Sequence, residues 1–328
     1  MKIVHAQTEI AGQMGIICKE LRKKGHQVAG YNCFHTYLNY RGDIHTTDAF
    51  EVMKEFEFLL NNSDIFHFHN ANTLIQDFAD LPLLKEKGKK MLMHHWGSDV
   101  RTVEMVNRLN PYPLPPTYYS DEEIHRQLTF LSEHIDTAIV QDYEAYHYVK
   151  DYYKNVYVVP LACNVDDFQV AYPSVSNNHP LIIHAPTNRE FKGSDYVESA
   201  ITKLHNQGNV FTYHILEKMS HDKALAEYLK ADIIIDQLLC GTYGMLSVEA
   251  MALGKPVVAF IRDDVRQKLP ADLPIVQATP DNLDEVLQGL INDPVRRHEI
   301  GKASRMYVEK YHSAERVTNE LVNIYEKL

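Results

Sequence analysis

The sequence predicts an α/β protein made of two doubly wound lobes, each with a parallel sheet covered by helices. Short apolar runs alternate with helix-length segments along the 328 residues, a pattern typical of parallel sheets with helices on both faces. Turn-forming residues at 170–180 interrupt this alternation, which then restarts. We therefore expect one lobe over residues 1–170 and a second over 171–328. The last helix can pack back on the first lobe.

In the first lobe, residues 2–6 are expected to form a strand, followed by a loop that holds Gly12 and Gly15. Residues 16–24 have apolar positions at helical spacing, and Gly25 is a stop signal. Apolar runs bounded by polar turns predict the remaining strands at residues 26–31, 64–69, 90–95, 138–141 and 156–160.

The second lobe repeats this rhythm and ends in helices. Ser194 and Ser220 are expected to cap helices, and Gly254 to end a helix over residues 247–253. Strands are expected at 181–185, 210–216, 231–236 and 256–260, and the final helices at 281–292, 294–311 and 313–328.

Composition narrows the class of function. The chain has 33 Lys and Arg against 44 Asp and Glu, so nucleic acid is not an expected partner. Four widely spaced cysteines and no signal-peptide pattern favour a reducing, cytoplasmic location. No apolar run is long enough to span a membrane. Basic clusters at 22–24 and 85–90 are either solvated or contact an anionic membrane surface weakly.

The most informative motif covers residues 241–258. Gly244 precedes a helix whose first turn is expected to include Glu249, and a helix N-terminus favours a phosphate group. Glu249 can accept hydrogen bonds from the two hydroxyls of a ribose. The alternative is a helix that only packs its apolar face on the sheet, with Glu249 complementing the helix dipole.

A second motif, at residues 184–193, directly follows a strand. Its Arg189 and Lys192 lie in a strand-to-helix loop, where two cations suit a leaving diphosphate. They are otherwise two solvated loop charges. Asp236 stands at the end of another strand of this lobe.

Four histidines stand at strand ends in the first lobe. His67 and His69 are two apart and share a face, and His94 and His95 end the next strand before Asp99. Zinc needs a third spaced ligand that this pattern does not provide, so we expect no metal.

Together these motifs resemble the retaining glycosyltransferases of family four. That family has the GT-B fold, in which two Rossmann-like lobes face across a cleft. The matching positions of its signature are Gly244, Glu249, Ala250, Met251, Ala252, Gly254, Pro256 and Val257. Lys192-Gly193 and the segments 64–69 and 94–101 match further family motifs. Gly241 replaces the usual first Glu, and Arg189 stands two positions after the usual Arg, where this chain has Thr187.

The resemblance implies metal-independent transfer of a sugar from a UDP- or GDP-sugar, with retention, to a carbohydrate, lipid-linked or protein acceptor. No cofactor is implied besides this co-substrate. Arg189, Lys192 and one of His94 and His95, with His95 favoured, are then catalytic. The implied donor-binding residues are Glu249, Gly244, Met245, Leu246, Gly15 and Asp236. The implied acceptor-side residues are His67, His69, Asp99 and Gly12. A nucleotide-sugar 2-epimerase and a non-catalytic nucleotide-sugar-binding protein are the alternatives.

Overall fold

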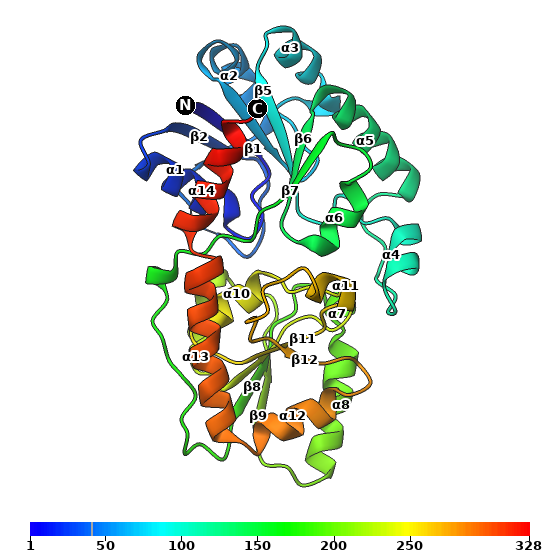
Figure 1. Cartoon of the computed structure of the whole chain (residues 1–328), viewed down its shortest axis with the longest axis vertical. Coiled ribbons are helices and arrows are strands. Elements are labelled where there is room, and N and C mark those ends of the chain that lie inside the picture. The colour runs from blue at the N-terminus through cyan, green and yellow to red at the C-terminus, as the bar shows by residue number, and fades with distance from the viewer. Residues whose placement is uncertain (41) are drawn as a thin grey trace. The chain divides into compact units, whose positions relative to one another are not determined.

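The computed structural model describes residues 1–40 and 42–328 (Figure 1). The described chain forms two compact units. The first contains Met1–Val106, Pro116–Ala162 and Ala314–Leu328, and the second contains Asn107–Pro115 and Cys163–Ser313. The linker at 170–180, where the sequence placed the division, lies inside the second unit by this partition.

The first unit is built on a seven-stranded sheet in the order β3-β2-β1-β4-β5-β6-β7. Every neighbouring pair is parallel. The strands are β1 Lys2–Gln7, β2 Gln27–Asn32, β3 His45–Thr46, β4 Ile65–His69, β5 Lys90–His95, β6 Thr137–Val140 and β7 Asn155–Val158. The sequence predicted all of these except β3, which is only two residues long.

Helices connect these strands and begin at recognisable caps. Asp48 and Asp142 accept backbone N–H groups at the starts of α2 and α6, and Ser120 forms a capping box with Glu123 at the start of α5. The helices of this part of the chain are α1 Gln13–Lys23, α2 Ala49–Asn62, α3 Leu81–Glu86, α4 Val103–Leu109, α5 Asp121–His134, α6 Tyr143–Val149 and α14 Ala314–Tyr325. Short 3-10 turns occur at Gln76–Phe78 and Val165–Asp167.

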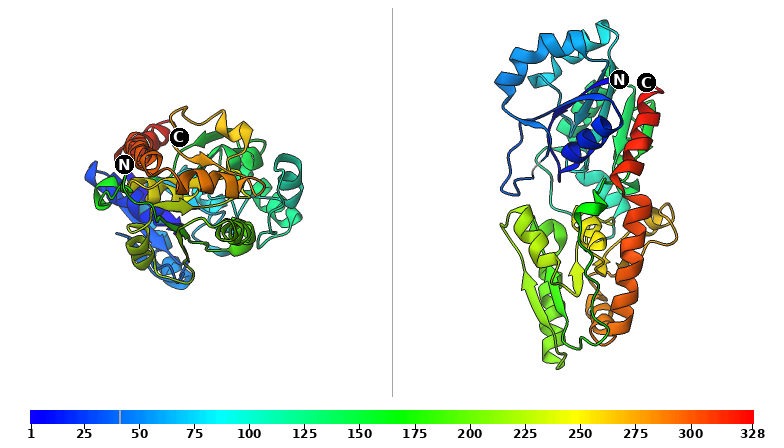
Figure 2. Two further views of the ribbon diagram at one scale, coloured as in Figure 1. Left: turned by 90° about the horizontal axis from the view of Figure 1, so that it is seen from below. Right: turned by 90° about the vertical axis from the view of Figure 1, so that its left-hand side faces the viewer.

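The C-terminal helix α14 belongs to the core of the first unit. It packs beside α1 (Figure 2) and buries Val317, Leu321 and Ile324 in a cluster with strand residues such as Ile3 and Leu92. These helix positions recur every three to four residues, which gives α14 one apolar face. The core of the first unit is therefore formed jointly by the N-terminal strand and helix and the C-terminal helix.

The second unit has a five-stranded parallel sheet in the order β12-β11-β10-β8-β9. Its strands are β8 Leu181–His184, β9 Thr212–Ile215, β10 Ile233–Ile235, β11 Val257–Ala259 and β12 Val276–Gln277. Its helices are α7 Arg189–Lys192, α8 Ser194–Asn206, α9 His221–Tyr228, α10 Met245–Ala252, α11 Asp263–Arg266, α12 Leu283–Ile291 and α13 Pro294–Tyr311.

Ser194 and Gly301 each have a specific packing role in this unit. Ser194 does not cap α8: it is the first helical residue, and its hydroxyl forms a 2.8 Å hydrogen bond with the His184 ring. Gly301 of α13 lies against the backbone carbonyl of Gly254, where a Cβ atom would clash. Glycine at 301 therefore allows the end of α10 and α13 to pack closely.

Within the described residues, none of the helices has the length and apolar content needed to cross a membrane. The four cysteines are free thiols.

Candidate functional site

The candidate site of the second unit lies at the carboxyl edge of its sheet. Strands β8 and β10 are parallel neighbours, so the loops that follow them lie side by side. Crevices at this edge are where doubly wound sheets bind ligands. The backbone N–H of Leu238 in the second loop donates to the Lys192 carbonyl at 3.1 Å, which joins the two loops directly.

Lys192 is the cation that the structure brings to this edge. Its Nζ donates to Asp236 Oδ1 at 2.7 Å and to Gln237 Oε1 at 2.8 Å. Gly193 ends α7 with a φ of 75°, and a Cβ there would lie 3.1 Å from Leu239 Cγ. The glycine thus permits the sharp turn that holds Lys192 against the loop after β10.

Asp236 organises the start of α10 from the interior. Its second carboxylate oxygen accepts from the Gly244 N–H at 3.1 Å and from the Ser247 hydroxyl at 2.6 Å, and the residue is fully buried. Burial raises the pKa of this carboxyl, but the charge of Lys192 and the hydrogen bonds from Lys192, Ser247 and Gly244 together outweigh burial and hold it below its usual value. The negative charge at this helix N-terminus is therefore supplied by the chain itself.

The expected donor-binding residues at the start of α10 are the accessible part of this helix. Gly244, Met245 and Leu246 are partly exposed, whereas the helix is buried from Ser247 to Ala252. The N-terminal end of α10 is thus the end that a ligand can reach.

Glu249 has a partner that the sequence analysis did not identify. Its Oε1 lies 2.6 Å from Nε2 of His221, the first residue of α9. Burial raises the pKa of Glu249. Burial opposes the charge on His221, but the hydrogen bond and charge of Glu249 prevail and raise its pKa. Both pKa values are thus raised, and only the folded chain brings the two side chains together.

Arg189 does not join Lys192 and Asp236. Its guanidinium contacts Glu198 at 2.5 Å and Glu217 at 3.3 Å. Arg189 thus forms ion pairs with one acid of α8 and one acid of the segment after β9. Of the two expected cations, Lys192 contacts Asp236 at the carboxyl edge of the sheet, and Arg189 does not.

The structure explains the glycine at position 241. Gly241 has a φ of 84°, and a Cβ there would lie 3.1 Å from Cβ and 3.2 Å from Cδ of Arg262. Arg262 is buried and forms a two-pronged ion pair with Asp264. The arginine side chain therefore covers the place that a side chain at 241 would take.

In the first unit, Gly12 caps α1 and Gly15 lies in its first turn, and an internal carboxylate occupies this helix N-terminus. Glu9 accepts from the N–H groups of Met14 at 3.0 Å and Gly15 at 2.8 Å, at the N-terminus of α1. Burial raises the pKa of Glu9 to about 7, against the opposing effect of these N–H groups. Gly15 also approaches the backbone of Gly42 so closely that a Cβ would lie 2.9 Å from its Cα.

His95 and Asp99 support each other in the interior. The ring of His95 forms hydrogen bonds with Asp99 Oδ2 at 2.7 Å and with the Tyr153 hydroxyl at 2.9 Å. Asp99 Oδ1 accepts from the N–H groups of Trp96 and Gly97 at 3.0 and 2.9 Å. Both ring nitrogens of His95 thus have protein partners, and the pair fixes the turn after β5.

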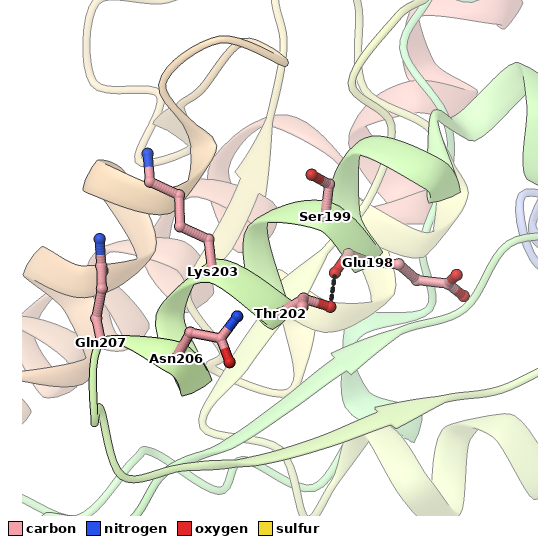
Figure 3. Close-up of a pocket in the computed structure, with 6 residues that line it drawn as sticks. All are labelled: Glu198, Ser199, Thr202, Lys203, Asn206 and Gln207. Carbon is pink, nitrogen blue, oxygen red and sulfur yellow. Dashed lines mark hydrogen bonds between the residues drawn. The ribbon is translucent and has the colours of Figure 1, made fainter.

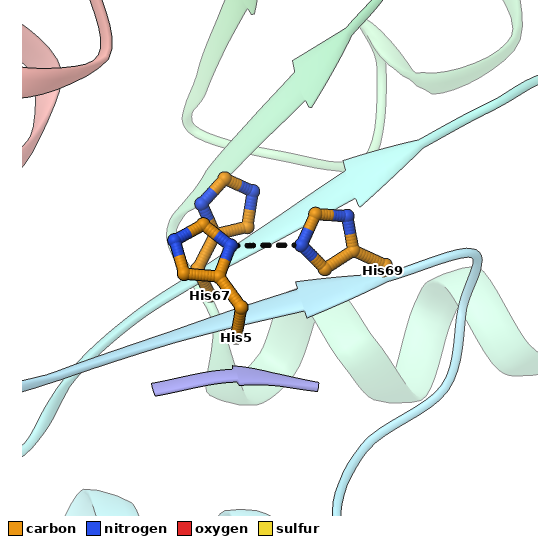
Figure 4. A group of neighbouring side chains, drawn as sticks. All are labelled: His5, His67 and His69. Atoms are coloured by element: carbon orange, nitrogen blue, oxygen red, sulfur yellow. Dashed lines mark hydrogen bonds between the residues drawn. The ribbon is translucent and has the colours of Figure 1, made fainter. Parts of the chain in front are cut away.

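The remaining first-unit candidates form a buried histidine cluster. His67, His69 and His94 lie with His5 in the core, each at most 2% exposed. Figure 4 shows His5, His67 and His69, whose nearest ligand atoms lie within 4.8 Å of one another. The sequence analysis did not include His5, although its register opposite His67 follows from pairing β1 with β4.

A hollow of about 520 Å³ lies elsewhere, along α8 (Figure 3). The residues that line it are Glu198, Ser199, Thr202, Lys203, Asn206 and Gln207. None of them is a predicted site residue, and the carboxyl edge of the sheet does not contribute to it. We therefore do not treat this hollow as the functional site.

Comparisons with known proteins identify the fold. No protein-family model matches the chain, and no curated protein matches it. Among solved structures it resembles sucrose-phosphate synthase from Thermosynechococcus elongatus, with a TM-score of 0.68, 13% identity and coverage of 100% of this chain and 99% of that one. HepE from Anabaena, in complex with UDP and glucose, has a TM-score of 0.70 at 12% identity, with both chains fully covered.

A third structure is the catalytic domain of starch synthase IV from Arabidopsis thaliana, bound to ADP and acarbose. Its TM-score is 0.61 at 13% identity, with 99% of each chain covered. At such low identity these likenesses establish the architecture. The chain has the GT-B fold of these glycosyltransferases, with seven- and five-stranded parallel sheets in its two units.

Proposed function

We propose that the protein is a glycosyltransferase that moves a sugar from a nucleotide-diphosphate donor to an acceptor hydroxyl, with retention of configuration and without a metal ion. The observation that carries this proposal is the arrangement of Lys192, Asp236 and the accessible start of α10 at the carboxyl edge of the second sheet. The UDP and UDP-glucose complexes of the structural neighbour HepE support a nucleotide-sugar donor.

In the proposed reaction, the bond between the sugar and the diphosphate breaks with its electron pair on the phosphate oxygen. The Lys192 ammonium donates hydrogen bonds to Asp236 and Gln237 with two of its hydrogens. Its third hydrogen is proposed to form a hydrogen bond with the departing phosphate oxygen. The N-terminus of α10 adds a positive partial charge. The acceptor hydroxyl attacks the same face of the sugar, and its proton passes to the departing phosphate.

Glu249, paired with His221, is proposed to accept hydrogen bonds from the ribose hydroxyls. Arg189 would have to exchange Glu198 and Glu217 for a phosphate group before it could act, so we assign the leaving group to Lys192. His95 has no unengaged ring nitrogen, and contact with the sugar is therefore assigned to His94, whose Nε2 has no partner among the described residues.

Nucleotide binding is the first test. Thermal unfolding is measured with UDP, GDP, ADP and CMP, and a ligand of the native state raises the melting temperature. Turnover of UDP- and GDP-sugars is then followed by nucleotide release, with and without EDTA. The proposal expects a raised melting temperature with UDP or GDP, and turnover that EDTA leaves intact. Loss of turnover in EDTA would contradict metal independence.

The role of Lys192 is tested by Lys192→Gln rather than Lys192→Ala. Alanine would leave the buried Asp236 carboxylate without the cation that neutralises it and destabilise the fold. Glutamine keeps a donor but removes the charge, so nucleotide affinity should fall by about tenfold or more. Lys203→Gln on α8, whose lysine pairs with Asp284, is the control and should leave affinity unchanged. Equal affinities in calorimetry would remove Lys192 from the site.

One observation favours a second candidate, a non-catalytic nucleotide-sugar-binding protein. Gly241 and the covering Arg262 leave no acidic side chain at position 241. A binding protein would show nucleotide-sugar affinity in calorimetry but no nucleotide release with any acceptor tried. Nucleotide release that depends on an acceptor would exclude it.

A further inference from the structure

Four buried histidines of the first unit lie on one face of its sheet, on three adjacent strands. His5 of β1 is opposite His67 of β4, and His69 of β4 is opposite His94 of β5. Side chains alternate between faces along a strand, so residues in register and residues two apart share a face. His69 ends β4 and His94 is the last residue but one of β5, whereas His5 and His67 lie further inside their strands.

These histidines and Tyr325 of α14 form a continuous chain of hydrogen bonds. His69 Nε2 lies 3.0 Å from His5 Nδ1, the contact drawn in Figure 4. His5 Nε2 lies 3.3 Å from the Tyr325 hydroxyl, which lies 2.6 Å from His67 Nδ1. His67 Nε2 lies 3.3 Å from His94 Nδ1. We call these five residues the histidine chain.

All four imidazoles of the histidine chain are neutral at physiological pH. Burial lowers the pKa of His5 to about 3 and the pKa values of His67, His69 and His94 well below the usual value. A neutral imidazole has one N–H group and one lone pair. The four rings and the hydroxyl therefore supply five hydrogens for four hydrogen bonds, which leaves one hydrogen over.

The alternation of ring nitrogens gives this count a specific consequence. Each ring in the histidine chain uses Nδ1 on one side and Nε2 on the other. If the Tyr325 hydroxyl donates within the chain, all bonds run in one direction. The four rings must then all carry hydrogen on Nε2, or all on Nδ1. The hydrogen that is left over is then on His94 Nε2 or on His69 Nδ1, and the other of these two atoms has a lone pair.

Both ends of the histidine chain are buried atoms with no protein partner. Within the described residues, His69 Nδ1 and His94 Nε2 form no hydrogen bond, and neither does Nε1 of Trp96, whose ring stacks on His94 at 3.9 Å between centroids. Gln7 Oε1 and Asn70 Oδ1, at the ends of β1 and β4, are also buried without a partner. Unpaired buried polar atoms are unfavourable, so their gathering at this edge indicates a polar ligand.

We propose that the histidine chain sets the tautomers of His69 and His94, so that one presents an N–H and the other a lone pair to a hydroxyl-bearing ligand. Tyr325, His5 and His67 act as positioning residues. A hydroxyl both donates and accepts, so a sugar complements either direction of the chain. The statement about the ligand rests on the proposed function. The statement about the tautomers does not.

The ring geometry favours hydrogen bonding over a shared metal ion. His67 and His69 stack with planes 5° apart and centroids 4.5 Å apart. The lone pairs of an imidazole lie in its ring plane, and nearly parallel stacked planes do not converge on one ion. In addition, His5 Nδ1 and His69 Nε2 are hydrogen-bonded to each other, and His67 Nδ1 is hydrogen-bonded to Tyr325.

The test is nuclear magnetic resonance of the full-length protein labelled with ¹⁵N-histidine, recorded without ligand. Long-range proton–nitrogen correlations distinguish the tautomers, and single His→Gln variants assign them. We expect the same tautomer in all four rings. Two rings with Nε2–H and two with Nδ1–H would overturn the proposal, as would a stoichiometric metal in the purified protein by elemental analysis.

Tyr325→Phe provides a second, directional test. It removes the partner of His5 Nε2 and of His67 Nδ1, and a buried N–H without a partner is less tolerable than a bare lone pair. The uniform set should become mixed, with Nδ1–H in His5 and His69 and Nε2–H in His67 and His94. An unchanged uniform set would refute the coupling. If this variant does not fold, the tautomers measured in the wild type still test the proposal.

Tyr153→Phe is the matched control, because it removes a buried hydroxyl whose hydrogen bond goes to His95, the sequence neighbour of His94, and not to the histidine chain. It should alter the His95 signals and leave the histidine chain uniform.

The ligand is tested by adding UDP-glucose to the wild type. A shift of the His94 Nε2 or His69 Nδ1 resonance supports the ligand. If UDP-glucose binds in the thermal assay without such a shift, His69 Nδ1 and His94 Nε2 contact only water. That result would overturn the proposal that a sugar hydroxyl binds at the two ends of the histidine chain. No thermal shift at all refutes the proposed donor and leaves the tautomer result standing.

Discussion

Glu249 and His221 show how one pair of side chains links a site residue to stability. Both pKa values are raised, so this pair binds a proton more tightly in the folded chain than in the unfolded one. A raised histidine pKa contributes stability that is complete below the unfolded value of 6.5 and is lost as the pH rises through the folded value.

We therefore predict that the difference in unfolding free energy between the wild type and His221→Gln shrinks as the pH rises above 6.5, the unfolded value. The measurement is urea denaturation at a series of pH values. His214→Gln, at an exposed position of β9, is the control and should give a difference that does not depend on pH in this way. A His221 difference that grew with pH would contradict the assignment.

Position 241 is constrained in two ways, by its backbone and by its neighbour. We predict that Gly241→Ala destabilises the second unit more than Gly208→Ala does. Both glycines have similar positive φ values, 84° and 79°, so both variants incur the cost of a left-handed alanine, about 1–2 kcal/mol. Only a Cβ at 241 meets another side chain, that of Arg262. Chemical denaturation measures both, and equal losses would show that Arg262 moves aside freely.

At the scale of elements, α14 matters most because its apolar face closes the core of the first unit. We predict that Leu321→Ala, at a fully buried position, lowers the unfolding free energy by about 2–5 kcal/mol through lost burial and a cavity. Asn323→Ala, on the exposed side of the same helix, should change it by less than about 0.5 kcal/mol. Similar effects of the two variants in thermal and chemical unfolding would argue against this packing.

Loops placed by short helices also decide which predicted charges meet. Lys192 and Arg189 are three residues apart at the two ends of α7, yet their charged groups pair with different acids. The sequence showed both cations beside a helix start but could not show which carboxylates they would face. Glu217 and Asp236 lie 28 and 44 residues from their partners and are brought to α7 by folding. Glu198 lies only nine residues from Arg189, but its carboxylate faces Arg189 only because of the turn between α7 and α8.

At the scale of the whole molecule, the two units differ in how the chain builds them. Residues 163–313 contain the entire five-stranded sheet and its apolar cluster, whereas the first unit needs residues 314–328 to cover its core. We predict that a fragment of residues 163–313 folds and that a fragment of residues 1–162 exposes apolar surface and aggregates. Circular dichroism, thermal unfolding and gel filtration measure both. A well-folded, monomeric 1–162 fragment would contradict the role assigned to α14.

The periodicity of apolar residues predicted most of the architecture. The alternation of strands and helices gave the α/β class, and the helix from Pro294 to Tyr311 begins and ends where its cap and sequence pattern predicted. Strand β3 was missed because two residues are too few to show an alternation. These features are local, since a strand or helix is recorded in the spacing of neighbouring side chains.

The sequence by itself thus determined the fold class, the strands whose ends carry polar residues, and the motifs of Lys192 and Glu249. Only the tertiary structure decided that Arg189 pairs elsewhere, that His221 joins Glu249, and that Tyr325 joins the histidines at the other end of the chain. The physical reason is that partners so far apart in sequence leave no periodic signal. Hydrogen bonds and ion pairs between them exist only after the sheets and helices have packed.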